Sequence, residues 1–191
     1  MNTPAHVIFA LAAFARPGDR KRTAAAAVGA LLPDASLYLM AGVALYVMGL
    51  SPERVFHDLY FSDAWQQVFA IDNSFIIWGA LLGLCQWRGW INGRVLVLSG
   101  LMHLAFDFAL HNDDARPQFW PLSDWVFASP FSYWDPAHYG AIIGPLEMAT
   151  SAVLGLILIQ RFWSLRSRAT ITALLAMQLA PVFIWAFVFS G

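Results

Sequence analysis

The sequence has little charge and almost no cysteine. Asp, Glu, Lys and Arg make up 12% of the 191 residues, about half of the share that is usual in soluble proteins. The 11 basic and 12 acidic side chains give a formal net charge of −1, which offers no basis for a nucleic-acid partner. Cys85 is the one cysteine, so an intrachain disulfide is excluded.

Apolar residues are what the sequence has in excess. They make up 59% of the chain, against roughly 45 to 50% in ordinary domains, and they form six runs at residues 3–15, 24–50, 72–87, 95–111, 139–159 and 170–190. Most of these runs are long enough to cross a bilayer core of about 30 Å as a helix. We therefore predict an all-α, polytopic transmembrane helical bundle of about six membrane helices, in a single integral membrane domain of residues 1–191. The first helix is short, and either a half-span or a tilted crossing fits its length.

The few basic residues lie in three separate segments. Residues 16–22 hold four of them, residues 88–94 hold two and residues 161–168 hold three, which leaves only Arg54 and Arg116. Acidic segments at 51–71 and 112–138 alternate with the basic ones. The positive-inside rule places the basic segments in the cytoplasm. We therefore expect a multi-pass protein of the bacterial inner (cytoplasmic) membrane with both termini on the outer side.

The second acidic segment, 112–138, is crowded with aromatic side chains. Rings of this density prefer the headgroup layer of a membrane. They belong to Phe119, Trp120, Trp125, Phe127, Phe131, Tyr133 and Trp134. Two interpretations stay open: a belt that anchors the loop at the membrane surface, or a lid under which a membrane lipid enters a site.

Ionisable side chains inside the apolar segments mark a candidate site. Each costs on the order of 3 kcal/mol near the bilayer centre, so those present usually face the bundle interior and are paired or functional. They are His6, Asp34, His103, Asp107 and Glu147, with Asp72 and His111 near the outer ends of their segments. Counting along each helix at about 1.5 Å per residue allows all of them to meet in one pocket between the midplane and the outer surface.

The fourth segment carries the sharpest local pattern. His103, Asp107 and His111 are each four residues apart, so successive members rotate by only about 40° around a helix and form one stripe. Imidazole nitrogens and a carboxylate at this spacing are suitable ligands for Zn²⁺ or a harder divalent ion. The alternative is a polar helix face that is hydrogen-bonded across the bundle.

Two further features lie near these residues. Pro33 removes a backbone donor inside the second segment, so we expect the helix to be kinked beside Asp34. The residues Asp72, Asn73 and Ser74 have the composition of an N-cap for the third segment.

Four short motifs resemble the YdjM-like inner-membrane proteins, which are described as membrane-bound metal-dependent hydrolases. The motifs are His6, Leu31-Leu32-Pro33-Asp34, His103-Leu104-Ala105-Phe106-Asp107 and Trp120-Pro121-Leu122-Ser123, and the resemblance covers residues 3–123. It implies an α-helical membrane hydrolase that uses a divalent metal. The family also has His-Arg-Gly and Thr-His-Ser motifs, which this chain lacks. Asn73 stands where the second of these has its histidine, so the chain resembles a divergent branch.

Three functional hypotheses follow. The first is a metal-dependent hydrolase that acts from the outer face on a lipid-borne or amphiphilic ester or phosphoester. Its divalent metal, Zn²⁺ or Mn²⁺, would be bound by His6, Asp34, His103, Asp107 and His111, with Asp72 or Glu147 as the general base. The second is a non-catalytic subunit that keeps the hydrolase-like scaffold and packs against other membrane-protein subunits. The third is a haem or pigment binder with His6 and His103 as axial ligands.

Overall fold

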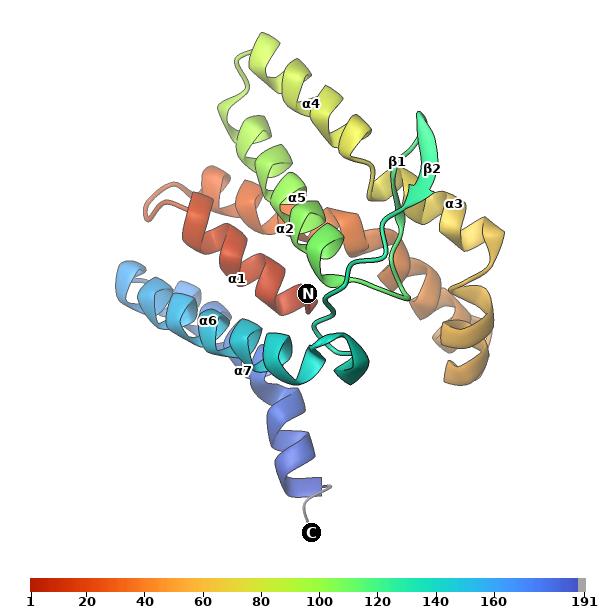
Figure 1. The fold of residues 1–191 in the computed structure, drawn as a ribbon. Helices are drawn as coiled ribbons and strands as arrows, with labels where there is room; N and C mark the ends of the chain where they lie inside the picture. The colour runs from red at the N-terminus through yellow and green to blue at the C-terminus, as the bar shows by residue number, and fades with distance from the viewer. Residues whose placement is uncertain (189–191) are drawn as a thin grey trace.

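The computed structural model describes the backbone of residues 1–188 and the side chains of residues 1–180, and it is built mainly from helices (Figure 1). The α-helices are α1 (Thr3–Phe14), α2 (Arg20–Gly42), α3 (Asp63–Asp72), α4 (Phe75–Trp87), α5 (Ile91–Leu110), α6 (Gly140–Arg161) and α7 (Leu165–Val188). The shorter elements are the π-helical segments η1 (Val43–Val47) and η2 (Arg54–Leu59), the 3₁₀ turn η3 (Pro136–His138), and the strands β1 (Pro117–Phe119) and β2 (Ser123–Val126). The predicted all-α fold is confirmed, and one small antiparallel hairpin is added within 112–138.

Four helical stretches of the described residues are long and apolar enough to cross a membrane, whereas we predicted about six. They are Arg20–Val47, Asp63–Trp87, Ile91–Leu110 and Gly140–Arg161. The first predicted segment forms α1, whose 12 residues rise about 18 Å and fall short of a bilayer core. The last predicted segment, 170–190, runs past residue 180, where side chains lie outside the described part of the chain.

The surface of α6 shows why this bundle suits a membrane. Its buried residues are mostly small or polar and recur at helical spacing: Gly140, Gly144, Glu147, Ser151, Gly155 and Leu158. Its outward residues are large and apolar, and Ile142, Leu146 and Val153 are each more than half exposed. A helix of a soluble protein has the reverse pattern, with its apolar stripe toward the core. Lipid tails are as apolar as these side chains, so the exposed face is stable in a bilayer.

The short helix α1 lies at the centre of the bundle. It contacts α2, α5, α6 and α7, and Figure 1 shows it between α2 and α5 on one side and α6 on the other. Its residues Ala5, Ile8 and Ala10 are fully buried. Because neighbouring helices surround it, α1 does not have to span the bilayer to be stable there. Its first turn brings His6 into the protein interior.

Helices α2 and α5 approach each other closely at Gly29. A Cβ atom on Gly29 would overlap the backbone carbonyl of Leu96, so the two backbones touch at a position that only glycine permits. This contact places α2, which carries Asp34, directly against α5, which carries His103 and Asp107.

The helical conformation is interrupted between α3 and α4, at Asn73 and Ser74. The Ser74 hydroxyl accepts hydrogen bonds from the backbone N–H groups of Ile76 and Ile77, both at 3.1 Å. A cap of α4 is therefore present where we predicted one, and Ser74 provides it. Asp72 is instead the last residue of α3.

The three basic turns lie at one end of the bundle. The connections between α1 and α2, between α4 and α5, and between α6 and α7 all lie toward the upper left in Figure 1, whereas the hairpin and the chain between α2 and α3 lie at the opposite end. The charge pattern predicts that these three turns share one side of a membrane, and their grouping in the fold is compatible with that prediction.

Candidate metal centre

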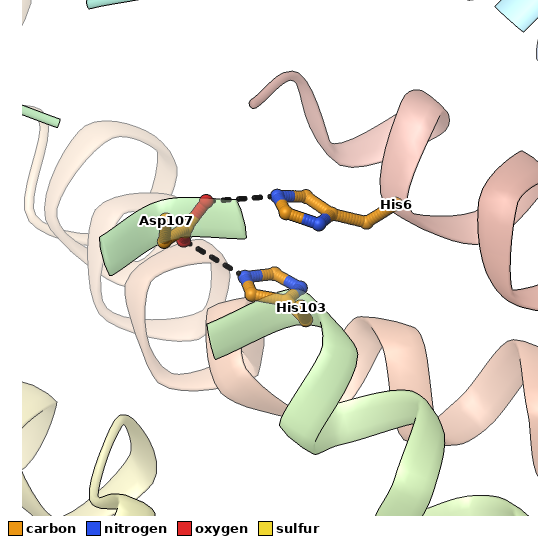
Figure 2. A group of neighbouring side chains, drawn as sticks. All are labelled: His6, His103 and Asp107. Carbon is orange, nitrogen blue, oxygen red and sulfur yellow. Dashed lines mark hydrogen bonds and ion pairs between the residues drawn. The ribbon is translucent and has the colours of Figure 1, made fainter. Parts of the chain in front are cut away.

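His6 of α1 and His103 and Asp107 of α5 form a compact, buried group (Figure 2). Nε2 of His6 lies 2.9 Å from Oδ1 of Asp107, and Nε2 of His103 lies 3.0 Å from Oδ2 of the same carboxylate. His103 and Asp107 meet because residues four apart lie on one face of a helix. The ligand atoms of the three residues lie within 4.8 Å of one another, so this group could hold a metal ion.

A backbone carbonyl determines which nitrogen of His103 is free. Nδ1 of His103 lies 2.7 Å from the carbonyl oxygen of Ala30 on α2. A carbonyl oxygen only accepts, so Nδ1 carries a proton and donates it. In the neutral ring, Nε2 then presents a lone pair to the Asp107 carboxylate, 3.0 Å away. Two electron-rich atoms at this distance repel each other unless a proton or a metal cation lies between them.

The two imidazole rings are stacked, which disfavours placing a positive charge on both. Their centroids are 3.6 Å apart and their planes differ by 10°, and both side chains are 1% exposed or less. Two imidazolium charges at this distance in a buried site would repel strongly. His103, whose Nδ1 donates to a backbone carbonyl, has the usual form of a metal ligand, whereas Nδ1 of His6 is buried and has no hydrogen-bond partner among the described residues.

The separations are those of hydrogen bonds. Ligand atoms that each lie about 2.1 Å from a tetrahedral Zn²⁺ are roughly 3.4 Å apart. The nitrogen–oxygen separations of 2.9 and 3.0 Å are shorter, so the side chains would have to move apart to admit the ion. Two imidazoles and one carboxylate also suit other divalent transition metals, which include Mn²⁺.

The same arrangement does not suit a haem. Two axial histidines approach the iron from opposite faces of the macrocycle. Here the rings of His6 and His103 lie against each other, and both Nε2 atoms point at the one carboxylate in Figure 2. The third hypothesis therefore lacks its ligand geometry.

The predicted ligand Asp34 lies beside the group rather than in it. Its Oδ1 is 3.7 Å from Nε2 of His103 and 3.7 Å from Nη1 of Arg116. Its Oδ2 accepts a hydrogen bond from the Thr3 hydroxyl at 2.7 Å. Helix α2 continues through Pro33, so Asp34 keeps a helical position that faces the interior.

The predicted ligand His111 caps α5 and contacts the outer side of Asp107. Its Nε2 lies 3.2 Å from Oδ1 of Asp107 and 3.3 Å from the amino nitrogen of Met1, which is itself 3.0 Å from the same oxygen. Its Nδ1 lies 2.8 Å from Oδ2 of Asp114. Burial lowers the pKa of His111, but the carboxylates of Asp107 and Asp114 outweigh burial and raise it overall. His111 thus contacts two carboxylates and the Met1 amino group, beside the three-residue group rather than in it.

The two predicted general bases are not hydrogen-bonded to the group. The carboxylate of Asp72 has no hydrogen bond or ion pair among the described residues, and its backbone carbonyl accepts from the indole of Trp78. Glu147 is buried on α6, where Oε1 accepts from the backbone and side chain of Asn2 and from Gln178. Glu147 therefore secures the start of α1.

A cavity of about 550 Å³ opens beside the three-residue group. This volume lies within the range of small-molecule sites, about 300 to 1,000 Å³. Its wall includes Asp34, Asp107, His111, Arg116, Tyr133 and Trp134. Tyr133 and Trp134 belong to the aromatic segment 112–138, so this part of the segment lies at a cavity. Phe119, Trp125 and Phe127 pack on one another in and near the hairpin.

Arg116 is the residue of the site that the sequence analysis missed. In the sequence it is only one of two basic residues outside the three basic segments. The available signal was its position, shortly after His111 in a turn rich in aspartate. Nothing in a helical pattern predicts that this turn folds back, because Arg116 follows the end of α5.

Asn73 links α2 to α3 by hydrogen bonds at the edge of the site. It is 0% exposed, and its Nδ2 donates to the carbonyl oxygens of Pro33 at 3.3 Å and Phe69 at 3.0 Å. It also lines a void of about 10 Å³ with Asp107 and Arg116, which is close to the space of one water molecule.

The arrangement combines a buried group that could hold a metal ion, a carboxylate at its edge and a cavity that Asp107 lines. Comparison with family models, with curated proteins and with solved structures finds nothing that matches this chain.

Proposed function

We propose that this protein is a membrane-embedded, metal-dependent hydrolase that acts on an ester of an amphiphile. One observation carries the proposal: the lone pair of His103 Nε2, directed by the Ala30 carbonyl, faces the Asp107 carboxylate 3.0 Å away beside His6. A divalent cation between the two atoms resolves this contact, whereas an ordinary hydrogen bond requires an additional proton on His103 or on Asp107. The cavity beside the group supplies room for a substrate.

The ligand set suits hydrolysis. A divalent ion held by His6, His103 and Asp107 would lower the pKa of water toward neutrality and polarise the ester oxygen. Asp34 is the best-placed base, because its Oδ1 lies 3.7 Å from His103 Nε2 and its side chain lines the cavity. Thr3 orients this carboxylate by donating to its other oxygen.

An amphiphilic substrate fits the surroundings of the site. The cavity wall includes the apolar side chains of Tyr38, Phe56 and Phe61, which are 58%, 45% and 53% exposed. The acyl chains of a membrane lipid would pack against these residues, with its polar group at Asp107. The chain's resemblance to YdjM-like inner-membrane hydrolases supports the same reaction and the same membrane, and the charge pattern supports access from the outer face.

The test uses detergent-purified protein that is stripped of metal with a chelator and reloaded with Zn²⁺ or Mn²⁺. Carboxyl and phosphoryl esters of p-nitrophenol with alkyl chains of increasing length serve as substrates. We expect hydrolysis to depend on the metal, to increase with chain length, and to be lost in His103→Ala but kept in His138→Ala. Hydrolysis that does not depend on metal would contradict the proposal. A parent protein that binds no metal would favour the non-catalytic subunit.

A further inference from the structure

Arg116 is a buried cation at the edge of the proposed site. Its side chain is 9% exposed, and it lines both the cavity and the small void beside Asp107. The guanidinium lies 4.8 Å from the ring centroid of Phe69, a distance that suits a cation–π contact and holds the group in place. Arg116 is thus positioned by the ring of Phe69 together with an ion pair to Asp34 at 3.7 Å.

The N–H groups of this guanidinium have few hydrogen-bond acceptors among the described residues. Nη2 donates to the Tyr60 hydroxyl at 3.5 Å, the long limit of a hydrogen bond. Nη1 is buried and has no hydrogen-bond partner among the described residues, although it forms an ion pair with Oδ1 of Asp34 at 3.7 Å. Arginine carries five N–H donors and stays charged in proteins. A buried cation with unused donors is costly unless a ligand completes it.

We propose that Arg116 binds the phosphoryl group of the substrate, so that the amphiphile is a lipid-borne phosphoester. This inference rests on the proposed function, because it places the phosphoryl group between Arg116 and the metal group. The planar fork of arginine matches two phosphoryl oxygens. The charges of a divalent ion and of Arg116 offset the carboxylates of Asp34 and Asp107, which would otherwise repel an anion.

The reaction then has a simple balance. The oxygen of a water molecule forms a new bond to phosphorus, and the bond from phosphorus to the alcohol oxygen breaks. One water proton passes to Asp34 and then to the leaving alcohol, and the other stays on the product phosphate or is released to solvent. Arg116 stabilises the charge that develops on the phosphoryl oxygens. No oxidant or further reactant is required.

The experiment measures binding of hexylphosphonate, a phosphonate that cannot be hydrolysed, by isothermal titration of zinc-loaded protein in nonionic detergent. Inorganic phosphate and hexyltrimethylammonium are titrated in parallel. We expect Arg116→Gln to weaken hexylphosphonate binding at least tenfold and Arg116→Lys to weaken it less, because lysine keeps the charge but loses the fork. Arg54→Gln is the matched control, since Arg54 is exposed, and it should bind like the parent.

The outcomes separate this inference from the proposed function. If Arg116→Gln and Arg116→Lys both bind hexylphosphonate like the parent, the inference is wrong even where zinc-dependent hydrolysis is intact. If the parent binds hexylphosphonate but no zinc, and both variants bind hexylphosphonate more weakly than the parent, the anion site stands and the hydrolase proposal fails. If Arg116→Gln does not fold, the hexylphosphonate affinity of Arg116→Lys relative to the parent decides the question. Equal affinity for inorganic phosphate and hexylphosphonate would overturn the lipid-borne source.

Discussion

The imidazole rings of His6 and His103 lie face to face, 3.6 Å between centroids, and direct both Nε2 atoms at the single carboxylate of Asp107 (Figure 2). The two histidines come from different helices, and the carboxylate between them belongs to one of those helices. Neutral rings can share this geometry, whereas two protonated rings cannot do so without strong repulsion. The relationship therefore brings three side chains that could hold a metal ion into one buried group.

Removal of any one of these three side chains should abolish tight metal binding. His6→Ala, His103→Ala and Asp107→Ala each delete one of few donors, so we expect zinc affinity to fall by more than the roughly 10- to 100-fold that the loss of an outer partner costs. Elemental analysis of purified protein measures the bound metal. His57→Ala changes an exposed histidine and His138→Ala a half-buried one that pairs with Asp135, so both should keep the parent stoichiometry. The same metal content in all five variants would show that the ligand assignment is wrong.

Asp34 and Glu147 should differ in their effect on hydrolysis. Asp34→Asn removes the proposed base, so we expect the rate to fall by about 10²- to 10⁴-fold with little change in zinc content. Glu147→Gln keeps an acceptor for Asn2 and should leave the rate within a few fold of the parent. Rates and metal content measured on the same preparations decide whether Asp34 or Glu147 is the base. A large loss in Glu147→Gln alone, in a folded and metal-loaded variant, would return the role of base to Glu147.

Gly29→Ala should destabilise both the bundle and the site. The added methyl would overlap the Leu96 carbonyl and push α2 away from α5, at a cost of about 2 kcal/mol. The shift also moves the Ala30 carbonyl away from His103, so zinc affinity should fall. Gly79→Ala is the control, because a Cβ there meets nothing within 4 Å and alanine favours a helix. Thermal melting and zinc titration of both variants test this, and equal melting temperatures would contradict the close α2–α5 contact.

Asn73→His tests the motif resemblance against the observed structure. The amide of Asn73 donates to two backbone carbonyls, and a histidine cannot reproduce both bonds. We expect a loss of about 1 kcal/mol of stability and an unchanged zinc affinity. Isothermal titration of Zn²⁺ and Mn²⁺ into chelator-stripped parent and variant measures the second quantity. Tighter binding by the variant would show that position 73 can supply a ligand, as the resemblance implies.

The sides of the membrane can be assigned with reporter fusions. The basic turns share one end of the bundle in Figure 1, so the positive-inside rule predicts a single orientation. Fusions after residue 55 and after residue 125 should report an external location, and a fusion after residue 165 a cytoplasmic one. A cytoplasmic report at residue 125 would place the cavity on the inner face and overturn access from outside.

The local parts of this protein were predictable from its sequence. Apolar runs and the rise of a helix indicate membrane helices, and the length of the first run already showed that it was too short for a simple span. The contact between His103 and Asp107 also follows from local spacing, because residues four apart share a helix face. The charge pattern predicts that the three basic turns lie on one side of the membrane.

The membership of the site was decided by the packing of helices against each other. From seven candidate residues, the fold brings His6, His103 and Asp107 into one group, leaves Asp34 at its edge and engages Glu147 with Asn2. It also adds Arg116, which no periodic pattern marks. Depth along a helix can be counted from the sequence, but rotation about each helix axis depends on contacts between helices, such as the close approach at Gly29. For that reason the sequence determined which residues lie at similar depth, and only the tertiary structure determined which of them touch.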